Sequence, residues 1–211
     1  FFVAYCASGM VSGARLFEQT VGMDYTNGLL VGAVSTILYV CIGGFLAVSW
    51  TDAVQATLMI FALVITPIII IADVGSISEA NALVAAKSPD MANMLKGTTL
   101  IGLISLAGWG LGYMGQPHIL VRFMAAATVR GMGGARRISI GWMIFCLLGA
   151  VLVGYYGVAF SAKHPEISVD NPEQIFIIVT QTLFTPWVAG ILLSAILAAV
   201  MSTLSCQLLV S

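Results

Sequence analysis

A run of glycines with aromatic and polar neighbours, residues 108–117 (GWGLGYMGQP), is the part of this sequence best suited to chemistry. Glycine costs a helix interior about 1 kcal/mol and proline about 3 kcal/mol, so four glycines plus Pro117 penalise a continuous helix by about 7 kcal/mol. An interrupted helix in an apolar segment is typical of transporter binding sites, because its unpaired backbone groups line a polar cavity. A glycine-rich helix packed closely against its neighbours is the alternative.

The same glycines imitate a nucleotide-binding motif. Gly110, Gly112 and Gly115 have the spacing GxGxxG, but a dinucleotide site needs a preceding strand and an acidic residue about 20 positions downstream, and neither is present. His118 and His164 have no acid or nucleophile at a recognisable spacing. We therefore expect no enzyme, no catalytic residue and no cofactor.

A second candidate is a face of small and hydroxyl residues near the end of the chain. At 100° per residue, Ser194, Ala198, Ser202 and Ser205 fall on one narrow face of a helix. Neutral hydroxyls suit a weakly bound hard cation. They suit close packing between membrane helices equally well, so the residues alone leave both interpretations open.

The composition is that of a membrane protein. Hydrophobic residues make up 60% of the 211 and charged residues only 8%, with a mean hydropathy of +1.04, whereas soluble domains carry roughly 25% charged residues. The net charge of −1 and the lack of aromatics among the basic residues exclude a nucleic-acid partner. The chain opens on Phe1 and stops at Ser211 inside an apolar run, so we expect a piece of a longer protein.

The charged residues divide the chain into apolar blocks of about 20 residues, the length that crosses a bilayer. We predict a single transmembrane domain over 1–211, with helices at about 1–14, 28–48, 53–72, 98–123, 138–160 and 186–211, and an amphipathic helix on the outer side at about 173–184. Residues 49–52 form the turn between the second and third helices. The loop that carries Arg130, Arg136 and Arg137 lies in the cytoplasm, following the bias of basic residues to the inside.

Three stretches resemble the solute:sodium symporter family, and the similarity extends along the whole chain. They are residues 42–52 (IGGFLAVSWTD) with Gln55, residues 108–125, and residues 194–205. The resemblance implies an all-α polytopic membrane protein that forms part of an inverted-repeat (LeuT-like) transporter core with one broken helix. The first core helix, which supplies further sodium ligands in the family, lies outside this chain.

The resemblance also implies a function and its partners. It indicates sodium-coupled import of L-proline by alternating access, by a multi-pass protein of the bacterial cytoplasmic (inner) membrane whose partners are L-proline, sodium ion and the lipid bilayer. Ser202 and Thr203 are the sodium ligands that it implies. There are two alternatives. The first is sodium symport of another solute, such as pantothenate or a sugar, and the second is a sensory membrane module fused to a histidine kinase. A plain channel suits a broken helix less well.

The chemistry of proline indicates where it binds. Its carboxylate needs N–H donors, its ammonium needs acceptors, and its ring needs a flat apolar wall. The broken segment offers all three, so we predict that Trp109, Tyr113 and Pro117 line the substrate site, with Tyr5 facing it from the first helix. An aromatic wedge that holds two helices apart is the alternative.

Overall fold

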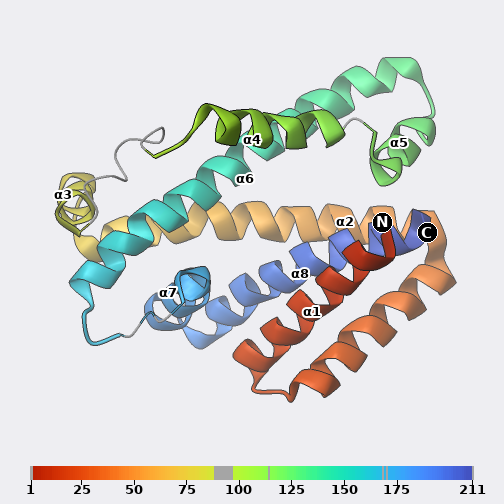
Figure 1. Ribbon diagram of the computed structural model, residues 1–211. Coiled ribbons are helices and arrows are strands. Elements are labelled where there is room, and N and C mark those ends of the chain that lie inside the picture. The colour runs from red at the N-terminus through yellow and green to blue at the C-terminus, as the bar shows by residue number, and fades with distance from the viewer. Residues whose placement is uncertain (1, 88–96, 114, 168, 170, 211) are drawn as a thin grey trace.

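Helices form all the regular structure in the part of the chain that the computed structural model describes, which is residues 2–87, 97–113, 115–167, 169 and 171–210. In chain order (Figure 1) they are α1 Phe2–Val21, α2 Tyr25–Val74, α3 Ile77–Lys87, α4 Leu100–Tyr113, α5 Pro117–Met124, α6 Val129–Lys163, the 3-10 turn η2 Pro172–Gln174, α7 Ile175–Leu183 and α8 Pro186–Val210. Helices α2, α6 and α8 are long and apolar enough to cross a membrane. This confirms an all-α fold suited to a membrane.

Helix α2 consists of two arms that meet at a kink. Gly44 has φ 52° and ψ −147°, a conformation that essentially only glycine adopts without strain. Figure 1 shows the first arm, in orange, running away from the long second arm at this point. The predicted turn at 49–52 is therefore wrong, because these residues belong to the second arm. There the Thr51 hydroxyl donates to the carbonyl of Ala47 at 3.0 Å within the helix.

Two other helix ends differ from the sequence-based ranges because capping residues decide them. Helix α1 continues past residue 14 to Val21, where Gly22 takes φ 68° and its N–H bonds to the carbonyl of Glu18. Helix α6 begins at Val129 rather than 138, because the Thr128 hydroxyl caps it by accepting from the amide of Gly131 at 3.2 Å. The three arginines predicted to lie in a loop thus lie on the first turns of α6.

Glycines lie where α1 packs on α8 and on the first arm of α2, and at Gly28 the packing is too tight for a side chain. A Cβ added at Gly13 would lie 3.4 Å from Val200 on α8, and one at Gly28 would lie 3.2 Å from the Ala14 carbonyl on α1. The GxxxG spacings in these helices therefore serve helix packing. A separate apolar core joins the second arm of α2 to α3, α6 and α7, with Ile70, Val84, Phe160 and Val179 at its centre.

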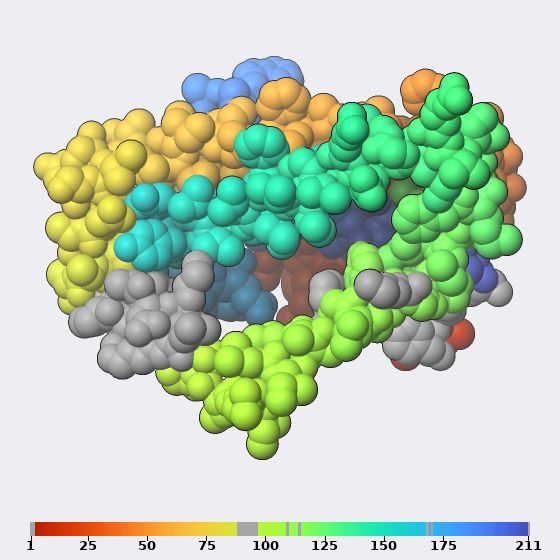
Figure 2. All heavy atoms as spheres, turned by 90° about the horizontal axis from the view of Figure 1, so that it is seen from above, coloured from red at the N-terminus to blue at the C-terminus, as the bar shows by residue number. Residues whose placement is uncertain are grey.

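Helix α4 stands apart from this bundle. Leu100, Ile101 and Leu111 are 74%, 80% and 72% exposed. Figure 2 shows the yellow-green α4 separated from the teal α6 by a hollow along much of its length. A helix this apolar and this exposed fits surroundings of lipid or of further protein helices rather than water.

Helix α6 crosses α2 closely at Gly149, and we expect Gly149→Ala to destabilise the full-length protein by about 1–3 kcal/mol through overpacking. The added Cβ would lie 2.5 Å from the Leu63 carbonyl oxygen and 2.9 Å from its carbon, which are backbone atoms that cannot rotate away. Thermal unfolding in detergent measures the effect. Gly154→Ala is the matched control, because its Cβ meets nothing within 4 Å on the same helix. Equal melting temperatures for the two variants would contradict this packing.

An ionic cluster fastens the far ends of α2 and α6 to each other. Asp73 accepts from His164 Nε2 at 3.1 Å and pairs with Lys163 at 3.2 Å, while Glu166 lies 2.9 Å from His164 Nδ1. Hydrogen bonds to Glu166 and Asp73 raise the pKa of His164 above its usual 6.5. Sequence reasoning missed this cluster because Asp73 and His164 are distant in the chain.

The cluster predicts a pH dependence of stability. A folded-state pKa raised above 6.5 means that protonated His164 contributes its full stabilisation below that value and loses it as the pH rises through the folded pKa. The full-length protein should therefore unfold at a higher temperature at pH 6 than at pH 8, by a small amount because the site is partly solvated. His164→Gln should remove the part of this difference in unfolding temperature that comes from protonation of His164. A variant that keeps the whole difference would show that another group titrates.

Candidate functional site

The glycine-rich segment is interrupted near where its composition predicts. Helix α4 ends at Tyr113 and α5 begins at Pro117, with Gln116 as its N-cap. The first three glycines of the run continue α4, so the break lies at its later end. The amides of Gly115 and Gln116 bond back to the last turn of α4, each at 3.3 Å, and are thus already engaged. The Gln116 Oε1 atom is buried without a hydrogen-bond partner.

The predicted substrate residues lie on three elements. Tyr113, 46% exposed, stacks edge-on against His118 with ring centroids 6.5 Å apart. Pro117 is the exposed first residue of α5, and Tyr5 is 43% exposed on α1. The backbone of Trp109 belongs to α4, but its side chain lies outside the described residues. The role of these four residues in substrate binding stays a prediction.

A polar centre, defined here as Asp52, Arg122, Ser202 and Cys206, joins three helices. Asp52 comes from the second arm of α2, Arg122 from α5, and the other two from α8. The Ser202 hydroxyl donates to Asp52 Oδ1 at 2.7 Å, and the Cys206 thiol lies 3.3 Å from Oδ2. Arg122 Nη2 forms an ion pair with Asp52 Oδ2 and contacts the Cys206 sulfur.

Of the two charged side chains in the polar centre, one is buried and the other is partly exposed to solvent. The Asp52 side chain is 10% exposed, whereas that of Arg122 is 46% exposed. A carboxylate buried this far is tolerated because a cation and hydrogen-bond donors satisfy it. Two further buried side-chain atoms near this centre have no hydrogen-bond partner. They are Oε1 of Gln55, one turn after Asp52, and Nε2 of Gln207, next to Cys206 in the chain. Unsatisfied buried polar atoms are rare in folded proteins, so this region has spare capacity for an ion or water.

The hydroxyl face of α8 serves two purposes. Ser194 donates to the Ile191 carbonyl at 2.6 Å and Ser205 to the Ser202 carbonyl at 3.0 Å, so these two bond within their own helix. Ser202 instead reaches across to Asp52. Thr203 is exposed and donates to the Ala199 carbonyl at 3.0 Å. Because Ser202 and Thr203 use their protons as donors, the lone pairs of their oxygens remain free for a cation.

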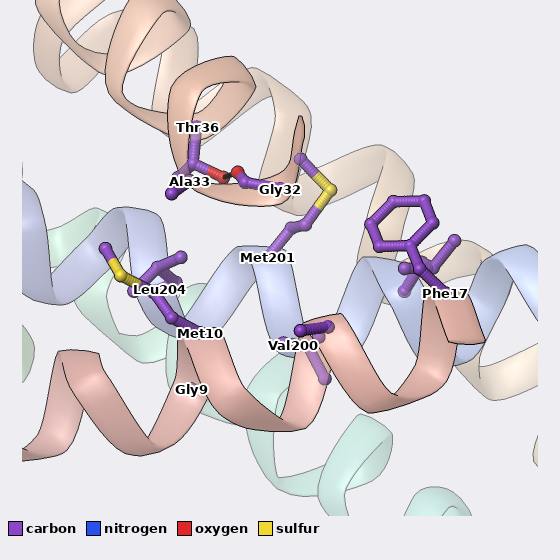
Figure 3. A pocket seen from close by; sticks show the side chains of 12 residues that line it. Gly9, Met10, Phe17, Gly32, Ala33, Thr36, Val200, Met201 and Leu204 are labelled. Atoms are coloured by element: carbon purple, nitrogen blue, oxygen red, sulfur yellow. Dashed lines mark hydrogen bonds between the residues drawn. The ribbon is translucent and has the colours of Figure 1, made fainter. Parts of the chain in front are cut away.

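A pocket between α1, the first arm of α2 and α8 is less suited to a polar ligand. Figure 3 shows its apolar lining, which includes Met10, Phe17 and Met201. The one hydroxyl in its wall, that of Thr36, already donates to the Gly32 carbonyl at 2.7 Å. A zwitterionic solute would find no charge partner there, so we assign this pocket to helix packing.

Sequence reasoning missed Asp52 and Arg122 as site residues. Both lie in the stretches that carry the family resemblance, but Asp52 falls in the predicted turn at 49–52 and Arg122 near the end of the predicted helix 98–123. An ionisable residue beside an apolar span is a functional candidate by default, and this signal was present. What the sequence did not show is that residues 52, 122 and 202 meet. No local signal in the sequence marks Cys206 either, although its thiol contacts both charged side chains.

Together, the long apolar helices, the interruption between α4 and α5 and the buried carboxylate beside hydroxyl oxygens describe an all-helical membrane protein with a polar centre inside it. The chain belongs to the sodium:solute symporter family, whose profile matches residues 1–211. It is 60% identical to the sodium/proline symporter of Escherichia coli (strain K12), 52% identical to that of Haemophilus influenzae, and 49% identical to the high-affinity proline transporter of Bacillus subtilis. Each alignment covers 100% of this chain but only 42%, 43% and 44% of the relative. No solved structure matches the chain.

Proposed function

We propose that this chain is part of a carrier that imports L-proline together with sodium by alternating access, in the bacterial cytoplasmic (inner) membrane, and that it catalyses no reaction. The names and identities of its relatives support this function, although the chain spans only about 42% of the length of the first of them. The observation that carries the proposal is the hydrogen bond at 2.7 Å between Ser202 and Asp52, which places hydroxyl and carboxylate oxygens from two helices together.

The sodium site in this proposal is built on α8 and completed by α2. Ser202 and Thr203 supply neutral oxygens, and Asp52 supplies the negative charge that a monovalent cation needs beside an apolar span. Thr203 faces away from the described helices, so its oxygen is open to a further element. The first core helix of an inverted-repeat (LeuT-like) fold would supply the missing ligands at that position.

The substrate site in this proposal is the interruption between α4 and α5. Tyr113 and Pro117 flank it, the unsatisfied Oε1 of Gln116 is an acceptor for the substrate ammonium, and the N-terminal end of α5 favours the carboxylate. Trp109 and Tyr5 are the other two predicted members of the apolar and aromatic wall. Energy comes from the ion, because one charge that crosses a potential of 100 mV releases about 2.3 kcal/mol.

Uptake of radiolabelled proline tests this function. The full-length protein is expressed in cells that lack their own proline carriers, and uptake is compared in sodium and choline media. Uptake that needs sodium and is competed by unlabelled proline supports the proposal. If the protein takes up only another solute with sodium, sodium coupling stands and proline is the wrong substrate. If it shows no sodium-dependent transport at all, both parts of the proposed function are wrong.

The substrate half has its own prediction. Tyr113→Phe should raise the apparent KM for proline at saturating sodium by about tenfold, because a lost hydrogen bond to a charged ligand costs about 1.5–3 kcal/mol. Expression should be normal, since the side chain is 46% exposed in this structure. Poor expression with an unchanged KM would instead indicate an aromatic wedge that only holds helices apart.

A further inference from the structure

Arg122 already occupies the carboxylate that the proposed sodium site requires. Its Nη2 atom pairs with Asp52 Oδ2, while Ser202 takes the other carboxylate oxygen at 2.7 Å. Within the described residues, Asp52 is the only acidic side chain that forms an ion pair with Arg122. The polar centre is therefore neutral as it stands, with one negative and one positive group.

A sodium ion that joined this centre would create an excess positive charge. Two cations that share one carboxylate repel each other, and the repulsion is strong where the carboxylate is 10% exposed and screening by water is weak. Movement of Arg122 away from Asp52 would relieve this repulsion, because its side chain is 46% exposed and can become solvated. Asp52 and Ser202 lie on long, packed helices and have less freedom.

Release of Arg122 would loosen a specific element. Helix α5 has only eight residues and none of them is buried, so little apolar packing holds it to the bundle. The ion pair with Asp52 is the only one that α5 forms among the described residues. Helix α5 also follows directly on the interruption that Tyr113 and Pro117 flank. A change at Asp52 thus reaches the proposed substrate site through one side chain.

We infer that Arg122 is a tethered cation that competes with sodium for Asp52, and that sodium binding frees α5 and so transmits occupancy of the ion site to the broken segment. This inference rests on the proposed function. It makes Arg122 a coupling residue rather than a ligand of either solute. The competing interpretation is a permanent structural ion pair that stays closed whether or not sodium is bound.

Sodium-dependent binding of radiolabelled proline to the purified full-length protein separates the two interpretations. Arg122→Gln should lower the sodium concentration for half-maximal binding by about fivefold or more, and should raise proline binding without sodium, because the competitor is gone. Arg122→Lys keeps the charge and should retain most of the sodium dependence. Arg136→Gln removes an exposed guanidinium from the start of α6 and is the matched control, with no change expected.

The thiol of Cys206 gives a second readout that does not depend on proline. It is 8% exposed and lies against Arg122, in a small pocket also lined by His118 and Val210. In a full-length protein whose other cysteines are replaced by alanine, sodium should accelerate alkylation of Cys206 by N-ethylmaleimide relative to choline. In Arg122→Gln the reaction should be fast with either ion.

The outcomes are distinct. If alkylation of Cys206 in the single-cysteine protein that keeps Arg122 is equal or slower in sodium than in choline, the inference is overturned, even if Arg122→Gln fails to fold. An unchanged sodium requirement in Arg122→Gln also overturns it, while sodium-dependent proline binding by the wild-type protein keeps the proposed function intact. Absence of sodium-dependent proline binding in the wild type would instead remove the proposed function itself.

Discussion

Asp52→Asn should raise the sodium concentration for half-maximal proline uptake by about a hundredfold or more in the full-length protein. The substitution keeps the shape of the side chain and an acceptor for the Ser202 hydroxyl, but removes the negative charge. In the sodium-bound state the pair that is lost is that of the Asp52 carboxylate with the ion; removing one partner of a buried ion pair costs about 3–5 kcal/mol, and each 1.4 kcal/mol is tenfold in an equilibrium constant. Because Asp52 is 10% exposed while Arg122 reaches solvent, we expect this cost to fall mainly on ion binding.

Asp24→Asn is the matched control for this experiment. Asp24 is the N-cap of α2 and accepts from the amide of Thr26 at 3.1 Å, in an exposed position on the same helix. Asparagine is as good an N-cap as aspartate, so this variant should transport normally. Sodium activation of Asp52→Asn within twofold of the wild type, measured as initial uptake rates over a range of sodium concentrations, would remove Asp52 from the ion site.

Ser202→Ala should weaken sodium activation by about tenfold or more with little loss of folded protein. Loss of a hydrogen bond or ligand contact to a charged partner costs about 1.5–3 kcal/mol, whereas one hydroxyl replaced by hydrogen disturbs packing very little. The variant leaves Asp52 Oδ1 without the donor that lies 2.7 Å away. Thr203→Ala should act in the same direction.

Ser194→Ala separates ion binding from the general role of hydroxyls on α8. Ser194 lies two turns earlier on the same face, but its hydroxyl donates to Ile191 in its own helix. We expect normal sodium activation in this variant. If Ser202→Ala and Thr203→Ala both keep the wild-type sodium dependence, measured by the same uptake titration, the cation is bound elsewhere and the hydroxyl face serves packing alone.

The sequence predicts the helices of this protein well where apolar length and backbone chemistry decide them. The helix that ends the chain, the short helix near residue 175 and the interruption before Pro117 follow from apolar runs, proline and glycine. The position of the kink in α2 does not, because the polar residues at 49–52 have the composition of a turn whereas Gly44 lies inside an apolar run. Only the backbone conformation of that glycine shows where the chain turns.

The candidate site was half predictable. Ser202 stood out as a hydroxyl on a small-residue face, and the broken segment stood out as an accumulation of helix-breaking residues. The partner of Ser202 is 150 positions away, and no local pattern relates Asp52 to it. The meeting of Asp52, Arg122 and Ser202 depends on how three helices pack, which periodicity within one helix does not reveal. The same limit concealed the contact between Asp73 and His164.

In the proposed function, sodium and proline cross the membrane together, with the ion held at Asp52 and Ser202. A single preparation can measure both fluxes, with the full-length protein reconstituted in liposomes that hold sodium at the external concentration and no proline. An inward proline gradient should drive uptake of radioactive sodium against no sodium gradient, and Asp52→Asn should abolish this proline-driven sodium flux at low sodium. Proline entry without accompanying sodium in the wild-type protein would contradict the account.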